Sequence, residues 1–216
     1  MFILNNENSI ANHFLAELRE EAIQKDRMRF RRNLERIAEL LAYEISKSLF
    51  YQSRNIKSPL EQTEIQLLHG FPVIISILRA GLPFHNGFLN VFDHADSGFL
   101  GAFRKHASDT DFSIEMDYEA LPPMEDKTVL LVDPMLATGK SMLQAIERIE
   151  SVSKPEKYFI ACAICTPEAA AFLAQRLTVS YDIYTGAMDR ALNDKLYIVP
   201  GLGDAGDLSY GSKHTH

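Results

Sequence analysis

The stretch 128–142 constrains the fold of this chain most, because it joins a buried strand to a helix through a short loop. Residues 128–132 (Thr-Val-Leu-Leu-Val) form an apolar run of the kind that parallel sheets bury on both faces. Asp133 ends the run, and Ala-Thr-Gly-Lys-Ser leads into a helix predicted to begin near Ser141. Such a turn directs backbone N–H groups and the positive end of a helix toward one point, which predicts a phosphate site.

Three side chains add to this predicted anion site. Thr138 and Ser141 carry hydroxyl donors at the start of the helix. Asp133 lies at the carboxyl end of the strand, where a carboxylate accepts hydrogen bonds from sugar hydroxyls or holds a hydrated cation. The residues alone leave both roles of Asp133 open.

Further apolar runs alternate with helical patterns along the chain. Strands are predicted at 72–78, 99–103, 158–165 and 179–184. Helices are predicted after Pro83 to about residue 91, and at 141–152 and 166–176. This alternation is typical of an α/β fold with a doubly wound, mostly parallel sheet flanked by helices. Ligands of such sheets bind beyond the carboxyl ends of the strands. Arg79, Arg104 and Asp133 each follow a predicted strand, so they are expected to meet at that edge.

The remaining segments are assigned around this core as parts of one domain, 1–216, with the core at about 71–185. Residues 8–50 are predicted to form helices, whose apolar face is available for a contact between subunits. A loop or a short strand pair is expected at 51–70, and a protruding two-stranded hairpin at 105–121. The carboxyl-terminal part, 186–212, is rich in glycine and aspartate and too irregular for a regular element, so a folded flap is expected there.

Composition and charge narrow the function classes. The chain has 216 residues, 46% of them apolar, and a formal net charge of −7. No apolar run approaches the roughly 20 residues that a membrane span needs, and the first residues lack the pattern of a signal peptide. A cytoplasmic protein that binds neither membranes nor nucleic acid is therefore expected. The basic run 25–32 indicates an exposed helix face or turn, or a subunit contact or effector site.

Two cysteines, Cys162 and Cys165, have the spacing C-x-x-C within a predicted strand. A redox or metal pair is one interpretation. Residues three apart on a strand face opposite sides, which favours two core residues instead.

The loop does not fit the common nucleotide-binding motifs. Gly139, Lys140 and Ser141 are similar to the end of a Walker A loop, which also requires a glycine five residues before Gly139. Pro134 occupies that position and has no backbone N–H to offer. The dinucleotide pattern G-x-G-x-x-G is absent from this stretch as well.

The loop 133–139 (Asp-Pro-Met-Leu-Ala-Thr-Gly) instead resembles the phosphoribosyl pyrophosphate loop of type I phosphoribosyltransferases, in the version of the uracil phosphoribosyltransferase family. Three other segments agree with that family in order and spacing: 77–82 (Ile-Leu-Arg-Ala-Gly-Leu), 101–104 (Gly-Ala-Phe-Arg) and 197–207 (Tyr-Ile-Val-Pro-Gly-Leu-Gly-Asp-Ala-Gly-Asp). The stretch from Phe30-Arg31 to Tyr43-Glu44 also fits. The resemblance therefore spans nearly the whole chain.

The resemblance implies an activity and a set of site residues. The expected reaction transfers the 5-phosphoribosyl group from phosphoribosyl pyrophosphate to N1 of uracil, giving UMP and pyrophosphate. Catalysis is expected from Arg79, Arg104, Asp133 and Asp204. Phosphoribosyl pyrophosphate is expected to contact Arg79, Arg104, Asp133, Pro134, Met135, Leu136, Ala137, Thr138, Gly139, Lys140, Ser141 and Asp204. Uracil is expected at Ile198, Gly203, Asp204 and Ala205, under a carboxyl-terminal hood.

The resemblance also implies partners and alternatives. Mg²⁺ is the expected cofactor, carried by phosphoribosyl pyrophosphate without a direct protein ligand and reached by Asp204 through water. A homodimer or tetramer is expected, and 105–121 is expected to close over the site. The alternatives are a related regulator that binds pyrimidine nucleotides and RNA, and a transferase for another base. Lys140 departs from the family, which usually has glycine there.

Overall fold

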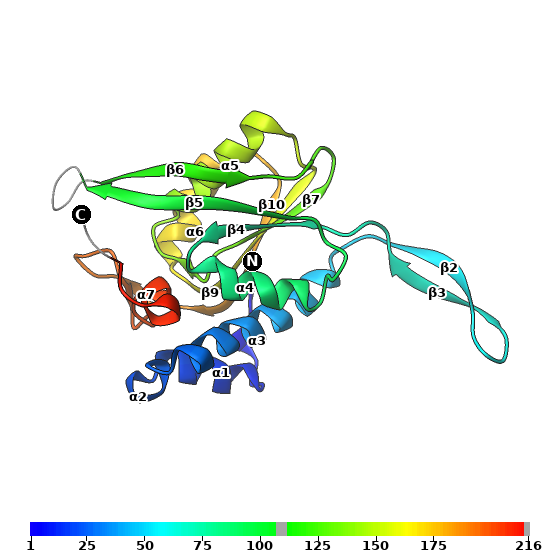
Figure 1. Cartoon of the computed structure of the whole chain (residues 1–216), viewed down its shortest axis with the longest axis horizontal. Helices are drawn as coiled ribbons and strands as arrows, with labels where there is room; N and C mark the ends of the chain where they lie inside the picture. Colours follow the sequence, from blue (N-terminus) through cyan, green and yellow to red (C-terminus); the bar gives the residue numbers. More distant parts are fainter. Residues whose placement is uncertain (107–111, 214–216) are drawn as a thin grey trace.

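An eight-stranded sheet forms the centre of the molecule, in the strand order β1-β10-β9-β7-β4-β5-β6 with β8 paired to β9 (Figure 1). The computed structural model describes the backbone of residues 1–106 and 112–213 and the side chains of 1–101 and 118–213. The strands are β1 (Phe2–Ile3), β4 (Val73–Leu78), β5 (Ser97–His106), β6 (Phe112–Ala120), β7 (Thr128–Val132), β8 (Met135–Leu136), β9 (Lys157–Cys165) and β10 (Tyr181–Met188). The β5–β6 pair is antiparallel, and the other neighbours run parallel.

Helices cover both faces of this sheet, which confirms the predicted doubly wound α/β architecture. They are α1 (Ala11–Arg19), α2 (Glu21–Gln24), α3 (Arg27–Ser46), α4 (Gly81–Leu89), α5 (Lys140–Val152), α6 (Pro167–Arg176) and α7 (Ala205–Tyr210), with a 3₁₀ turn η1 (Leu4–Asn6). Side chains of β7 alternate between the two apolar clusters. Leu130 and Val132 face α1, α3 and α4, whereas Val129 and Leu131 face α5 and α6. In the described part of the chain, no helix combines the length and apolar character needed to cross a bilayer.

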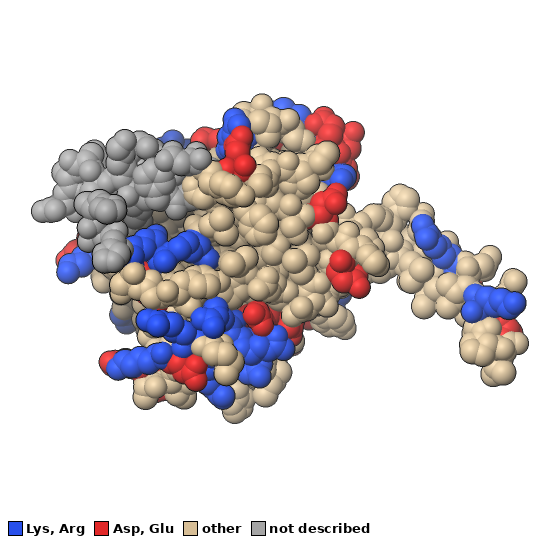
Figure 2. Space-filling view, in the orientation of Figure 1, with Lys and Arg blue, Asp and Glu red and all other residues tan. Residues whose placement is uncertain are grey.

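Side-chain caps fix where two of the helices, α3 and α6, begin. Thr166 caps α6 by accepting a hydrogen bond from Ala169 N (3.0 Å), and Pro167 occupies the first position of the helix. Asp26 caps α3 by accepting from Arg29 N (3.1 Å). The helix therefore begins inside the basic run 25–32. Basic side chains gather over this amino-terminal end of the molecule (Figure 2).

Two strands that the sequence left ambiguous form an arm. The strands β2 (Tyr51–Lys57) and β3 (Gln62–Leu68) pair as an antiparallel hairpin that stands out from the body (Figure 1). The two-stranded hairpin predicted at 105–121 is present, but its strands begin earlier than predicted. It consists of β5 and β6, paired at the edge of the main sheet, and residues 107–111 lie outside the described residues.

The carboxyl-terminal segment is more regular than predicted. It contains the short antiparallel pair β11 (Ala191–Leu192) and β12 (Ile198–Val199), followed by α7. Asp204 caps α7, since its Oδ1 accepts from Asp207 N at 2.9 Å. The run Asp-Ala-Gly-Asp is thus a helix start, and its glycine hid the helical pattern.

The prediction that Cys162 and Cys165 face opposite sides of their strand is wrong. Both are buried in the cluster on the α5 and α6 side. The alternation breaks between them, where Pro134 O accepts from both Ala163 N (3.0 Å) and Ile164 N (3.1 Å). Burial raises the pKa of the Cys162 thiol, which keeps it protonated and inert and fits the predicted core role.

One buried histidine makes stability depend on pH. The His85 side chain on α4 is 1% exposed, and its Nε2 lies 3.1 Å from Ser97 Oγ. Burial lowers the pKa of His85 to about 4. The unfolded chain, with an ordinary histidine pKa of about 6.5, binds this proton more tightly, so stability falls as the pH drops from about 6.5 toward 4.

We expect wild-type protein to lose about 1.2 kcal/mol more unfolding free energy between pH 7 and about pH 5.5 than the His85→Gln variant. Urea unfolding of both at the two pH values measures this difference, since other titrating groups are shared. His94→Gln, which removes an exposed imidazole, is the control substitution. Equal pH dependence in wild type and His85→Gln would contradict the assignment.

Candidate active site

The loop after β7 is fixed from behind by the neighbouring strand. Asp133 N donates to Ala161 O at 3.1 Å, and Pro134 O accepts from two backbone N–H groups of β9. Leu136 O accepts from Thr166 N (3.2 Å), and Ala137 O accepts from Thr166 Oγ1 (2.7 Å). Hydrogen bonds to β9 and Thr166 therefore hold the carbonyl groups of the loop, which makes the loop rigid before any ligand binds.

The helix that follows opens on a residue that must be glycine. Gly139 has φ of +77°, and a Cβ atom there would lie 3.0 Å from Phe172 Cδ1. The first N–H groups of α5 have no partner within the helix, and they carry the positive end of its dipole. Thr138 Oγ1 accepts from Lys140 N at 3.3 Å. Lys140 is exposed, lies at the first position of α5 and has no positive φ.

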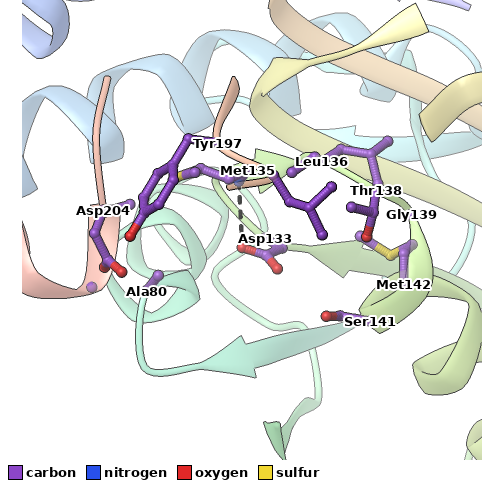
Figure 3. A pocket seen from close by; sticks show the side chains of 14 residues that line it. Ala80, Asp133, Met135, Leu136, Thr138, Gly139, Ser141, Met142, Tyr197 and Asp204 are labelled. Carbon is purple, nitrogen blue, oxygen red and sulfur yellow. Dashed lines mark hydrogen bonds between the residues drawn. The ribbon is translucent and has the colours of Figure 1, made fainter. Parts of the chain in front are cut away.

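A cavity of about 160 Å³ lies between this loop and the carboxyl-terminal segment (Figure 3). Figure 3 shows Asp204 and Tyr197 at one end, Thr138, Gly139 and Met142 at the other, and Asp133 between them. Asp133 Oδ1 accepts from Met135 N at 3.3 Å. The residues that line the cavity are Ala80, Asp133, Met135, Leu136, Ala137, Thr138, Gly139, Ser141, Met142, Leu196, Tyr197, Asp204, Ala205 and Gly206.

The carboxyl-terminal wall comes from two turns. Leu196, with φ of +60°, ends a loop in which Asn193 Oδ1 accepts from both Lys195 N (3.0 Å) and Tyr197 N (2.9 Å). This loop places the half-exposed Tyr197 ring at the cavity (Figure 3). The cap of α7 supplies the rest, since Asp204, Ala205 and Gly206 follow one another around the turn.

Arg79 lies beside the cavity and contacts α7. Its Nη2 is 3.2 Å from Asp207 Oδ1 and 3.4 Å from Gly211 O, and its side chain is 38% exposed. A Cβ atom on Gly206, which lines the cavity, would lie 3.8 Å from the same Nη2. The guanidinium therefore stands within reach of a ligand in the cavity while it pairs with Asp207.

The structure brings most of the predicted site residues together. Seven residues of the predicted phosphoribosyl pyrophosphate loop line the cavity, and Asp204 and Ala205 of the predicted uracil set do so too. Buried Pro134 and exposed Lys140 do not line it, nor do Ile198, which is 5% exposed on β12, and Gly203. Arg104 lies on β5, but its side chain is outside the described residues. The roles of these residues stay predictions.

Five lining residues were not predicted: Ala80, Met142, Leu196, Tyr197 and Gly206. Tyr197 and Gly206 belong to the glycine-rich segment that was singled out, and each flanks a predicted contact residue. Ala80 and Met142 follow Arg79 and Ser141 directly. Four of these residues could have been predicted, because each lies next to a predicted contact residue in the sequence. Leu196 has no such neighbour, and only the conformation of its loop brings it to the cavity.

A loop at the carboxyl edge of a doubly wound sheet, opened by an acidic residue and followed by a helix start, suits an anionic ligand, and this loop lacks the glycine that a Walker loop requires. Fold and site together define the type I phosphoribosyltransferase class. Comparison with known proteins then specifies the family. The model of the family described as uracil phosphoribosyltransferase matches residues 5–212. The chain belongs to this family, which catalyses the conversion of uracil to UMP with phosphoribosyl pyrophosphate.

Individual relatives agree. The uracil phosphoribosyltransferase of Porphyromonas gingivalis is 43% identical over 210 residues, which cover 97% of each chain. That of Pyrococcus furiosus is 35% identical over 200 residues, covering 91% of this chain and 84% of its own. The solved structure of the AQ2163 protein from Aquifex aeolicus superposes with a TM-score of 0.84 at 29% identity and covers 97% of this chain and 98% of its own.

Lys140→Gly is expected to keep kcat/KM for phosphoribosyl pyrophosphate within about threefold, which corresponds to less than about 0.7 kcal/mol of barrier. Lys140 is exposed and does not line the cavity, and its φ does not demand glycine. Steady-state kinetics measure the effect. Gly139→Ala is the contrasting variant, because a Cβ at φ of +77° is strained and meets Phe172, so its kcat/KM should fall much further. A large loss in Lys140→Gly would place that ammonium on the substrate.

Proposed function

We propose that this chain performs the family reaction in the cavity between the phosphate loop and α7. The proposal is supported by the two chain segments that line opposite sides of the cavity. One is the anchored loop with the start of α5, and the other is the cap of α7 with Asp204 and Ala205. The first suits the ribose and 5′-phosphate, and the second suits the base. Uracil N1 would then lie against C1 of the sugar, which brings the reacting atoms together.

The proposed uracil subsite reads the base mainly with backbone groups of Ile198, Gly203, Asp204 and Ala205. Asp204 and Ala205 line the cavity, and Ile198 and Gly203 belong to the same loop segment. Uracil presents an acceptor–donor–acceptor edge, and a fixed backbone can match that pattern. Cytosine presents a different edge and would leave buried groups without partners, which a polar site rejects strongly. This reading depends on the position of the loop backbone more than on any side chain.

Catalysis in this proposal is electrostatic. Cleavage of the bond between C1 and the pyrophosphate oxygen leaves positive charge on the sugar and adds negative charge to the leaving group. Asp133 lies where it can face the sugar, and Arg79 stands where it can face the pyrophosphate. Fixed groups of this kind stabilise the developing charges without reorganising during the reaction.

Mg²⁺ is proposed as the cofactor. Among the described residues, no three His, Cys, Asp or Glu side chains are placed to hold a metal ion together. Such a set would suit a resident metal, whereas Mg²⁺ commonly keeps several waters and binds substrate phosphates with one or two carboxylates. Asp204, exposed at the cavity, fits an outer contact through water. When bound, the ion would neutralise pyrophosphate charge.

The proposal is tested with phosphoribosyl pyrophosphate, Mg²⁺ and a panel of labelled bases: uracil, cytosine, hypoxanthine and orotate. We expect nucleotide product from uracil alone. Product from another base with none from uracil would overturn the assignment of the base. Loss of activity with EDTA and recovery with added Mg²⁺ tests the cofactor. A cytoplasmic location stays a prediction.

We also propose a homodimer, or a dimer of such dimers, in which the β2–β3 arm contacts a second copy. The register places Ile56, Ile65 and Leu67 on one face of the arm, where they are 41%, 43% and 37% exposed. A two-stranded hairpin with no core of its own is at best marginally stable. The helices named above as a subunit contact are less suitable, because α3 buries its apolar face within the chain.

Sedimentation velocity tests this assembly. We expect wild-type protein to sediment as a dimer or tetramer and Ile56→Glu/Ile65→Glu to sediment as a smaller species. Gln66→Glu adds a charge to the opposite face of the same arm and should leave the assembly unchanged. Identical sedimentation of wild type and the double variant would remove the arm from the interface.

A further inference from the structure

An ion pair between the first helix and the last sheet strand holds the loop proposed to read uracil. Arg19 ends α1, and Asp189 follows β10. Arg19 Nη1 and Nη2 donate to Asp189 Oδ2 and Oδ1 at 2.9 and 2.6 Å. The side chains are 24% and 4% exposed. The pair is therefore bidentate and shielded, the geometry in which arginine positions a carboxylate best.

Both members also bind the same residue of the loop. Asp189 Oδ2 accepts from Gly201 N at 2.8 Å, and Arg19 Nη1 donates to Gly201 O at 3.0 Å. Gly201 has φ of +65°, and a Cβ there would lie 2.1 Å from Ile198 O, so this turn admits only glycine. The ion pair thus forms hydrogen bonds with both the N–H and the C=O of Gly201, the residue on which the turn depends.

The next residue of the loop is tied to the same helices. Gln24 on α2 donates from Nε2 to Leu202 O (3.3 Å) and to Leu18 O (2.8 Å). Asp189 is itself fixed, because its N–H donates to Cys165 O at 2.8 Å. The loop therefore has anchors on the main sheet and on the amino-terminal helices. None of these anchors lines the cavity.

We propose that Arg19 and Asp189 are positioning residues that set the affinity for uracil by fixing the backbone at Gly201. The inference rests on the proposed backbone reading of uracil. A loop that recognises a base edge through N–H and C=O groups needs them held to within about half an ångström. Short strands and isolated turns do not supply that rigidity, whereas a shielded bidentate pair does. Neither side chain touches the substrate.

The kinetic signature separates this role from general support of the fold. Displacement of the loop weakens uracil binding and leaves the phosphate loop, anchored on β9 and Thr166, in place. We expect Arg19→Met and Asp189→Asn each to raise KM for uracil at least about tenfold, which corresponds to about 1.4 kcal/mol. KM for phosphoribosyl pyrophosphate should change less than about threefold. Because the two act as a unit, the double variant should resemble the worse single variant.

The matched control is Arg29→Met, which breaks the Arg29–Glu17 pair between α3 and α1 without touching the loop. It should leave both KM values near wild type. A second measurement, hydrogen exchange of the 198–205 backbone, should show faster exchange in Arg19→Met than in Arg29→Met. Unchanged KM for uracil and unchanged exchange in folded Arg19→Met would overturn the inference, as would equal effects of the two variants. If wild type makes no product from uracil, the proposed base fails, and the exchange data still decide whether the pair holds the loop.

Discussion

Asp133→Ala is expected to lower kcat at least about tenfold, a barrier increase of about 1.4 kcal/mol. The carboxylate ends β7 in the middle of the cavity (Figure 3) and accepts a hydrogen bond from Met135 N at 3.3 Å. The carboxylate therefore has two roles. It faces the position proposed for the sugar, and it holds the first turn of the phosphate loop. Alanine removes the negative charge next to a sugar that becomes cationic and also loosens that turn.

Asp133→Asn separates the two contributions, because an amide oxygen can still accept from Met135 N while the charge is lost. Steady-state pyrophosphate release gives kcat and both KM values, and circular dichroism with thermal unfolding shows whether each variant is folded. If charge carries the effect, the asparagine variant loses nearly as much turnover as alanine. Near wild-type kinetics in a folded Asp133→Ala protein would place the reacting atoms elsewhere.

Arg79→Ala is expected to lower kcat at least about tenfold and to raise KM for phosphoribosyl pyrophosphate. The guanidinium contacts Asp207 and the carbonyl of Gly211, beside the cavity wall formed by Gly206. Pyrophosphate gains negative charge as its bond to the sugar breaks. A planar cation with several N–H donors stabilises that charge in a way that a neutral methyl group cannot.

Arg148→Ala is a matched control for this substitution. Arg148 pairs with Glu119, and their side chains are 41% and 44% exposed, close to the 38% and 40% of Arg79 and Asp207. It is not among the cavity residues, so its kinetics should match wild type. Arg79→Lys keeps the positive charge but loses the planar set of N–H donors, so its kcat should lie between those of Arg79→Ala and wild type. Kinetics of Arg79→Ala equal to those of Arg148→Ala would exclude Arg79 from the site.

The features of the fold that rest on local pattern could be predicted from the sequence. The apolar runs of β4, β7 and β9 were recognisable because a central parallel strand is buried on both faces, as Leu130 and Leu131 show. The cap at Thr166 was recognisable because capping uses a side chain and its immediate neighbours. The phosphate loop falls in the same group, since strand, acid, turn and helix follow one another within 15 residues of sequence.

The features that depend on distant contacts could not be predicted. The strands β1, β8, β11 and β12 have two residues each, too few for any periodicity. Cys162 and Cys165 lie on the same side of β9 because the pairing there is irregular. The carbonyl of Pro134 accepts hydrogen bonds from two consecutive N–H groups of β9. The contact between Arg19 and Asp189 joins residues 170 positions apart. In the sequence, Arg19 is an ordinary charged residue at the end of a helix.

The anchors of the Gly201 loop have a consequence for the biogenesis of the protein. The loop is synthesised long after Arg19 and Gln24, which precede the loop residues they contact by 182 and 178 positions. Contacts of such long sequence separation form late, because the intervening chain must close first. During translation, the phosphate loop can assemble on β7 and β9 while the ribosome still holds the carboxyl-terminal segment. The base subsite is complete only when these distant contacts have formed, after the phosphate loop is in place.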